Sequence, residues 1–207
     1  SIYGMNDITH LGFYDIPLIS NIPNMVYLAP TSKDEYFAML NYSIEQNNYP
    51  IAIRIPCNGV IEDNRKVDTD YSKLNKYKVE KNGEKIAIIA LGDFYQLGEN
   101  LRNKIITELN IEPTLINPRY ITGLDNELLA ELMEKHYLVI TLEDGILDGG
   151  FGEKISRYYS DTNMLVKNYG IKKSFYDRYS VEELLKENNL TVEQIIEDIK
   201  EISKKWR

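Results

Sequence analysis

The chain has 207 residues, of which 43% are hydrophobic, so it can bury a sizeable core in one large or two small domains. Its 24 basic and 32 acidic residues give a net charge of −8, which argues against sequence-independent binding to nucleic acid or anionic lipid. A single cysteine, Cys57, excludes an internal disulfide, and no apolar run approaches the roughly 18 residues that span a bilayer. We therefore expect a cytoplasmic protein with neither a nucleic-acid nor a membrane partner.

The N-terminal part begins with a polar loop and continues with two short strands and a helix between them. Residues 26–29 are apolar and end at Pro30, which predicts a buried parallel strand. Ser32 and Glu35 have the spacing of a capping box, and apolar residues then recur at helical spacing. The run 51–55 is rich in β-branched residues and lies between prolines, which predicts a second strand.

Two features predict a domain boundary in the middle of the chain. Residues 61–76 are charged and lack a sustained apolar period, which indicates an extended, exposed linker. Asn82 and Gly83 then separate two strand-like runs, 77–79 and 86–91, and this dipeptide is typical of a tight β-hairpin. The second domain is predicted to begin at about residue 77.

Strand-like and helix-like segments alternate in the second half. This alternation predicts a three-layer α/β domain with a mostly parallel sheet. The predicted strands are 86–91, 114–116, 137–142 and 164–166, and the predicted helices lie around 97–109, around 128–133 and directly after the glycines at 149–152. Two more helices are predicted at the end of the chain, because Ser180 with Glu183 and Thr191 with Gln194 have capping-box spacing.

The N-terminal loop also carries a family resemblance. Residues 6–15 read Asn-Asp-Ile-Thr-His-Leu-Gly-Phe-Tyr-Asp. They resemble the loop Asp-Gly-x-Thr-His-x-Gly of the transketolase-type thiamine diphosphate enzymes, most closely the 1-deoxy-D-xylulose 5-phosphate synthase family, which continues through Ile-Pro-x-Met to Ala-Pro. The positions in register are Thr9, His10, Gly12, Asp15, Ile22, Pro23, Met25, Ala29 and Pro30. Positions 118–119, 143–144, 149–152 and 179–184 resemble the C-terminal domain of the same family, so the resemblance covers nearly the whole chain.

The resemblance implies a domain assignment and an activity. Residues 1–60 would be the C-terminal section of the thiamine pyrimidine-binding domain, 61–76 a linker, and 77–207 the transketolase C-terminal domain. The full enzyme of this family is a transferase that joins a two-carbon unit from pyruvate to glyceraldehyde 3-phosphate, in isoprenoid and thiamine biosynthesis. It uses thiamine diphosphate and Mg²⁺ and is expected to be a homodimer.

The family's cofactor motifs are absent from this chain. The family holds magnesium and diphosphate with a Gly-Asp-Gly motif and activates thiamine with a glutamate, both in the region upstream of this one. We therefore assign no cofactor-binding or metal-binding residue here. The chain is expected to be inactive alone and to need an upstream cofactor-binding half as partner, in the same or a separate chain.

His10 is the candidate catalytic residue. It lies in a polar loop, and an imidazole that titrates near neutral pH can move a proton or donate to an oxygen as charge develops. In the family, this histidine faces the reactive carbon of the cofactor and the substrate oxygens. The competing interpretation is a surface histidine that caps a turn. The second histidine, His136, precedes a predicted strand and is interpreted as structural.

Two further residues are candidate substrate-binding groups, Asn6 and Arg54. Arg54 lies on an otherwise apolar strand, so it should have a fixed anionic partner, and an ion pair within the fold is favoured over substrate binding. Asn6 stands where the family has aspartate. Cys57 takes the place of the family arginine associated with the substrate phosphate, and a thiol cannot supply bidentate donors to a phosphate. The sequence therefore leaves the substrate open.

Three alternatives remain at the level of the sequence. The glycines at 149–152 could form an anion cradle, but close helix packing is favoured because their spacing is not a dinucleotide fingerprint. The chain could be the C-terminal subunit of a split transketolase-like enzyme with a different, unphosphorylated substrate. It could also be an interaction protein that has kept the scaffold and lost catalysis.

Overall fold

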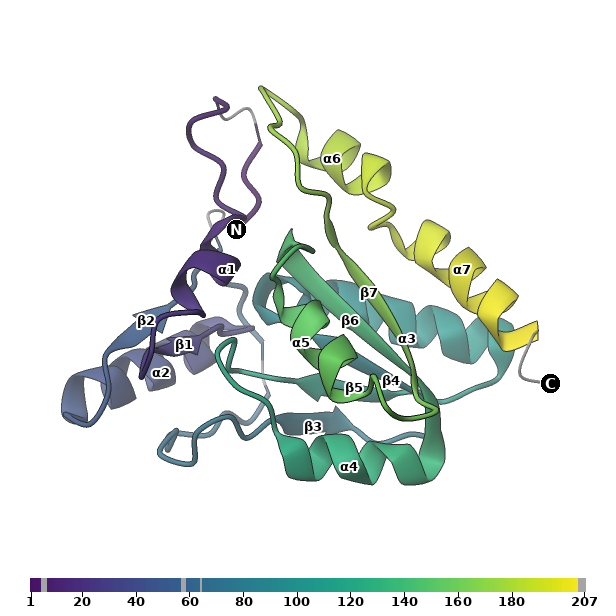
Figure 1. The fold of residues 1–207 in the computed structure, drawn as a ribbon, viewed down its shortest axis with the longest axis horizontal. Coiled ribbons are helices and arrows are strands. Elements are labelled where there is room, and N and C mark those ends of the chain that lie inside the picture. Colours follow the sequence, from purple (N-terminus) through teal and green to yellow (C-terminus); the bar gives the residue numbers. More distant parts are fainter. Residues whose placement is uncertain (5–6, 57–58, 64, 205–207) are drawn as a thin grey trace.

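The computed structural model describes residues 1–4, 7–56, 59–63 and 65–204, and its centre is a five-stranded mixed sheet (Figure 1). The strands are β3 (Lys78–Lys81), β4 (Lys85–Ala90), β5 (Thr114–Asn117), β6 (His136–Ile146) and β7 (Leu165–Ile171). Their order across the sheet is β3-β5-β4-β6-β7. All neighbouring pairs are parallel except β3 and β5, which are antiparallel.

Helices cover both faces of this sheet. On one face lie α4 (Asn126–Lys135) and α5 (Phe151–Tyr158), and on the other lie α3 (Tyr95–Leu109), α6 (Val181–Glu187) and α7 (Val192–Lys204) (Figure 1). In β4, Ile86 and Ile88 belong to the core with α3 and α7, whereas Ala87 and Ile89 belong to the core with α4 and α5. Successive strand residues point to opposite faces, so a doubly covered strand must be apolar throughout. The predicted three-layer, mostly parallel α/β fold is confirmed.

The predicted hairpin around Asn82 and Gly83 is wrong, because β3 pairs with β5 and not with β4. The residues between β3 and β4 lie instead beside the segment before β5, where the Glu84 amide donates to the Glu112 carbonyl at 2.9 Å. The residues of the two strands explain this arrangement. β4 is almost entirely buried and needs a neighbour on each side, whereas β3 carries charged side chains that suit the edge of a sheet.

The N-terminal part forms a smaller two-stranded parallel sheet. Its elements are α1 (Asp15–Ile19), β1 (Val26–Leu28), α2 (Lys33–Glu45) and β2 (Ile51–Ile53), so both predicted strands and the helix between them are confirmed. The segment after β5 joins this part to the larger sheet. The Ala29 amide donates to the Arg119 carbonyl at 2.8 Å, and the Ile121 amide donates to the Tyr27 carbonyl at 2.7 Å.

The cap of α2 is only half of the predicted capping box. The Ser32 hydroxyl accepts from the Glu35 amide at 3.3 Å, as expected. The Glu35 carboxylate, however, accepts from the Thr31 amide at 2.8 Å and from the Asn117 side chain at 2.9 Å. It therefore ties the first turn of α2 to the end of β5 instead of closing the box.

Residues 61–76 contain no helix or strand in their described part, and the predicted exposure holds for many of them, such as 68–70, but not for all. Tyr71 is 1% exposed and packs between Tyr42 and Tyr120. The Arg65 guanidinium lies 4.0 Å from the centre of the Tyr95 ring, a cation–π contact. The segment therefore packs against α2, α3 and the segment after β5, and the division into domains at residues 60 and 77 stays a prediction.

Candidate functional site

The loop that carries His10 is fixed at its base and exposed at its tip. Phe13 is fully buried and packs against Tyr176 and Tyr179, in the segment between β7 and α6. The Phe13 carbonyl accepts from the Ile146 amide at 3.0 Å, at the end of β6. The loop is thus anchored to the C-terminal part of the chain.

At the tip, His10 is exposed and is oriented by its neighbours in the loop. Its backbone amide donates to the Asp7 carbonyl at 2.9 Å, and its Nδ1 lies 2.8 Å from the Thr9 hydroxyl. The Thr9 hydroxyl is also 3.3 Å from an Asp7 carboxylate oxygen. These contacts hold the ring in one orientation at the surface of the chain. Its predicted catalytic role remains to be tested.

Arg54, just after β2, lies at the centre of a buried ionic cluster. It is 6% exposed, and its Nε donates to Asp15 Oδ2 at 2.7 Å. Its Nη1 donates to Asp144 Oδ1, and its Nη2 lies 3.4 Å from the Gly12 carbonyl. The expected fixed anionic partner is confirmed, and there are two of them. These contacts use the guanidinium within the fold, so its role in substrate binding stays a prediction.

The carboxylates around Arg54 come from two different parts of the chain. Asp15 begins α1 and also accepts from the Tyr27 hydroxyl, whereas Asp144 lies near the end of β6. Burial alone would raise the pKa of Asp15, but the adjacent guanidinium of Arg54 outweighs it and lowers this pKa. Asp144 is fully buried, and its Oδ2 has no hydrogen-bond partner. The cluster locks α1 and β2 against β6.

Glu143, next to this cluster, caps α5. Its carboxylate accepts from the Phe151 amide at 2.8 Å and from the Gly152 amide at 2.7 Å. Burial raises the pKa of Glu143 to about 7, against the opposing effect of these two amides. A Cβ at Gly150 would lie 2.4 Å from the Ile146 carbonyl oxygen and 2.7 Å from the Glu143 carboxylate. The predicted close packing is therefore confirmed for Gly150, while the two amides that follow it bind a carboxylate of the chain itself.

Sequence reasoning missed some partners and placed others correctly. In the sequence, Asp15 stands out only because it aligns with the loop of the family. Its pairing with Arg54 could not be predicted, because 39 positions separate the two residues. His136 is structural as expected, with ring contacts of 2.8 Å to the Thr114 hydroxyl and 2.9 Å to the Leu132 carbonyl. Asn6 and Cys57 lie outside the described residues.

The described residues do not provide a metal site. Within the described ranges, no group of three or more His, Cys, Asp or Glu side chains could hold a metal ion. The acidic side chains near Arg54 are used by the guanidinium, and that of Glu143 is used by backbone amides. These carboxylates therefore form contacts within the fold and do not fit a metal ion.

Comparison with known proteins shows which sequences this chain resembles. The 1-deoxy-D-xylulose-5-phosphate synthases of Clostridium tetani and Alkaliphilus oremlandii are each 34% identical to the chain, over 200 and 204 residues, and the aligned regions cover 96% of the chain and 32% of each relative. The synthase of Clostridium perfringens strain 13 is 38% identical over 162 residues, covering 77% of the chain and 26% of the relative. The chain thus spans about a third of the length of the first two relatives.

A solved structure and a family model agree with this similarity. The structure described as "Split gene transketolase, inactive beta4 tetramer" matches with a TM-score of 0.75 and 22% identity, covering 94% of this chain and 62% of that one, which shows the fold. The model of the family "Transketolase, C-terminal domain" matches residues 75–195. The chain therefore belongs to the transketolase C-terminal domain family and resembles the C-terminal portion of 1-deoxy-D-xylulose-5-phosphate synthases.

Proposed function

We propose that this chain is the C-terminal part of a thiamine diphosphate-dependent transferase that joins a two-carbon unit from pyruvate to glyceraldehyde 3-phosphate. The observation that carries the proposal is the similarity to 1-deoxy-D-xylulose-5-phosphate synthases over 96% of the chain. In this proposal, His10 moves a proton at a substrate oxygen, and the upstream half supplies thiamine diphosphate and Mg²⁺. The full protein would be a cytoplasmic homodimer.

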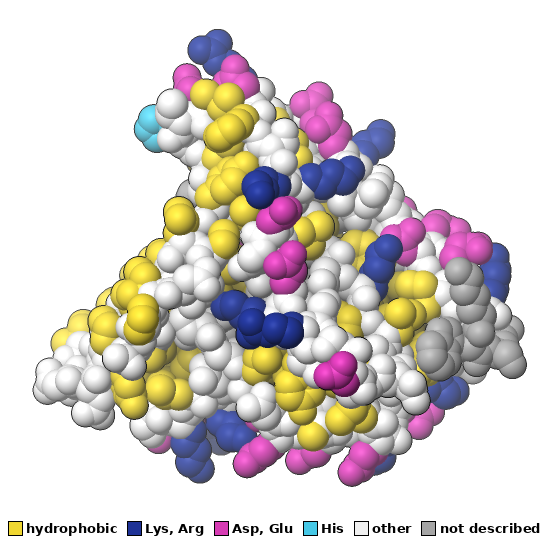
Figure 2. Space-filling view, viewed as in Figure 1, with side chains coloured by type: hydrophobic (Ala, Val, Ile, Leu, Met, Phe, Trp, Pro, Cys, Tyr) yellow, Lys and Arg dark blue, Asp and Glu magenta, His cyan; other side chains and the backbone are white. Residues whose placement is uncertain are grey.

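The N-terminal part has the features of an incomplete domain. Parallel sheets are normally covered on both faces, and a sheet of two strands is marginal by itself. Here β1 and β2 form such a sheet, and nearby large apolar side chains are exposed, among them Leu18 at 70%, Phe37 at 48% and Ile44 at 72%. Figure 2 shows hydrophobic side chains gathered on this side of the molecule, over α2 and β2. This surface supports the proposal that an upstream half packs there.

The alternative is a split enzyme, in which the upstream half is a separate subunit. The similarity in fold to a split-gene transketolase is the observation that favours this alternative. An intact-mass measurement on the protein purified from its source separates the two. A single polypeptide of which this 24.0 kDa chain is about a third would have a mass of about 75 kDa, whereas in a split enzyme the polypeptide that contains this sequence would be much smaller than that.

In the described part of the chain, no helix has the length and apolar character needed to cross a membrane.

The activity test uses the complete protein with thiamine diphosphate, Mg²⁺, pyruvate and glyceraldehyde 3-phosphate. We expect steady carbon dioxide release from the complete protein and none from the 207-residue chain alone. The variant His10→Asn should lower kcat by about 100-fold or more, as expected for loss of a proton-transfer group. The matched control is His136→Asn, which removes the other histidine and should lower stability more than kcat. Steady turnover by the chain alone, or an unchanged kcat in His10→Asn, contradicts the proposal.

The variant Cys57→Arg tests the substrate. If the active enzyme uses a phosphorylated acceptor, restoring the arginine of the family at this position should increase the affinity for that acceptor, because a guanidinium binds phosphate through two parallel hydrogen bonds. Unchanged affinity for the phosphorylated acceptor would favour the split enzyme with an unphosphorylated substrate. Absence of activity in every variant of the complete protein would favour a protein that interacts without catalysis.

A further inference from the structure

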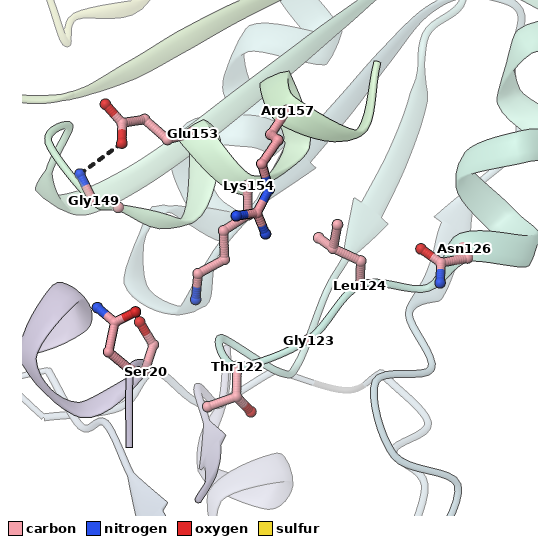
Figure 3. A pocket seen from close by; sticks show the side chains of 11 residues that line it. Ser20, Thr122, Gly123, Leu124, Asn126, Gly149, Glu153, Lys154 and Arg157 are labelled. Atoms are coloured by element: carbon pink, nitrogen blue, oxygen red, sulfur yellow. Dashed lines mark hydrogen bonds between the residues drawn. The ribbon is translucent and has the colours of Figure 1, made fainter. Parts of the chain in front are cut away.

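A polar cavity lies away from the loop of His10. It has a volume of about 650 Å³ and is formed between α5, the start of α4 and the segment after α1 (Figure 3). None of its lining residues belongs to the His10 loop or to the cluster around Arg54. Its volume is within the range of small-molecule sites. The lining includes a single hydrophobic side chain, Leu124, so it suits a polar ligand.

Two cations from successive turns of α5 enter this cavity. Figure 3 shows the side chains of Lys154 and Arg157 extending from α5 toward the segment that carries Thr122. Lys154 Nζ donates to the Ile121 carbonyl at 3.0 Å, and no described carboxylate forms an ion pair with either cation. Burial lowers the pKa of Lys154, and Arg157 lowers it further, whereas Glu143 acts in the opposite direction. A bound anion would relieve this unfavourable environment.

The other polar groups of the cavity complete a set of donors. The Ser20 hydroxyl is buried and has no hydrogen-bond partner. The Thr122 hydroxyl accepts from the Tyr27 amide at 3.3 Å, which leaves its own proton available. The acidic residue in the lining is Glu153, and it accepts from the Gly149 amide at 2.8 Å. The lining therefore contains two cationic and two hydroxyl-bearing side chains for one carboxylate, in a chain whose net charge is −8.

We propose that this cavity binds a small phosphorylated, hydroxyl-bearing molecule, with the phosphate on Lys154 and Arg157. A guanidinium and an ammonium together match a phosphate dianion, which offers more acceptor oxygens than a carboxylate. The cavity is larger than inorganic phosphate needs, and without aromatic side chains in its lining it does not favour a nucleotide base. The site is independent of the transfer reaction proposed above, because it shares no residue with the His10 loop.

The test is calorimetric titration of the full chain with inorganic phosphate, ribose 5-phosphate and ribose. We expect ribose 5-phosphate to bind more tightly than inorganic phosphate, and ribose not to bind. The variant Arg157→Gln should weaken ribose 5-phosphate binding about tenfold or more, the size expected for loss of a charged hydrogen bond. Because Arg157 is exposed, this variant should fold normally, which circular dichroism can check. Lys154→Gln combined with Arg157→Gln should abolish binding.

The control is the double variant Lys135→Gln with Lys186→Gln, which removes the same charge from α4 and α6 and should leave binding within about twofold of wild type. The variant His10→Asn should also bind normally, which separates this site from the proposed reaction centre. Absence of phosphate and ribose 5-phosphate binding up to about 10 mM overturns the proposal. It is also overturned if Arg157→Gln binds like wild type, or if the control loses affinity equally.

Discussion

Replacing Arg54 by methionine should be among the most damaging single changes in the described part of the chain. Methionine keeps much of the side-chain volume but removes both ion pairs. The Asp144 side chain has 0% exposure, so its charge cannot be rehydrated in place, and the cost of leaving it unpaired is about 3 kcal/mol. The Asp15 side chain is 24% exposed, and after allowance for solvent its pair contributes about 1 kcal/mol. The expected loss in free energy of unfolding is about 4 kcal/mol.

The assay is urea denaturation followed by circular dichroism at pH 7, with the free energy of unfolding extrapolated to water. Combining Arg54→Met with Asp144→Asn should recover about 2 kcal/mol relative to Arg54→Met, because a neutral amide needs no counter-ion. The control is Lys33→Met, which removes an exposed pair with Glu62 at 2.5 Å and should have little effect. A loss below about 1 kcal/mol in Arg54→Met, or no recovery in the double variant, refutes the reasoning.

The pH dependence of the same variant gives an independent check. Arg54 lowers the pKa of Asp15 in the folded chain below its ordinary value of 3.8. Asp15 therefore binds protons less tightly when folded, and its contribution to stability is fully present above pH 3.8 and lost as the pH falls through the lowered pKa. Arg54→Met lacks this contribution. The difference in stability between wild type and variant should narrow as the pH is lowered below 3.8.

Three further changes test other parts of the packing. Burial raises the pKa of Glu143 to about 7 from an ordinary value of 4.5. The contribution of Glu143 to the free energy of unfolding should therefore be greatest below pH 4.5 and decline by up to about 3 kcal/mol toward pH 7. Urea unfolding of Glu143→Gln should lack this decline. Tyr71→Ala should lower the free energy of unfolding by about 3–5 kcal/mol, measured by thermal or urea unfolding. Tyr71→Phe should be neutral or stabilising, because the buried Tyr71 hydroxyl has no hydrogen-bond partner, and equal losses in the two variants would contradict this. Glu35→Ala should lower the free energy of unfolding by about 2–3 kcal/mol, because it leaves the Asn117 side-chain amide and the Thr31 backbone amide unpaired. If the loss is no larger than that for replacing an exposed acidic residue, the link between α2 and β5 is refuted.

The sequence alone determined the elements of the fold and their class. The alternation of apolar strands with helix patterns is local information, and it located β4 to β7 and the helices between them, although β6 ends at Ile146 and β7 at Ile171, beyond their predicted ends at 142 and 166. The caps at Ser180 and Ser32 depend on contacts three residues apart, so they too could be predicted, although only the first forms a complete box. The family resemblance of the His10 loop is likewise a property of the sequence.

Only the tertiary structure decided the pairings between distant segments. The choice of β5 as the neighbour of β3 depends on which strand can be buried on both sides, and a dipeptide such as Asn82-Gly83 does not contain that information. One cavity is lined by Lys154 and Arg157 of α5 and by the distant Ser20, and Arg54 forms ion pairs with carboxylates 39 and 90 positions away in the sequence. Such contacts form because burial makes an unpaired charge costly, and the identity of the partner follows from where the folded chain brings the groups together.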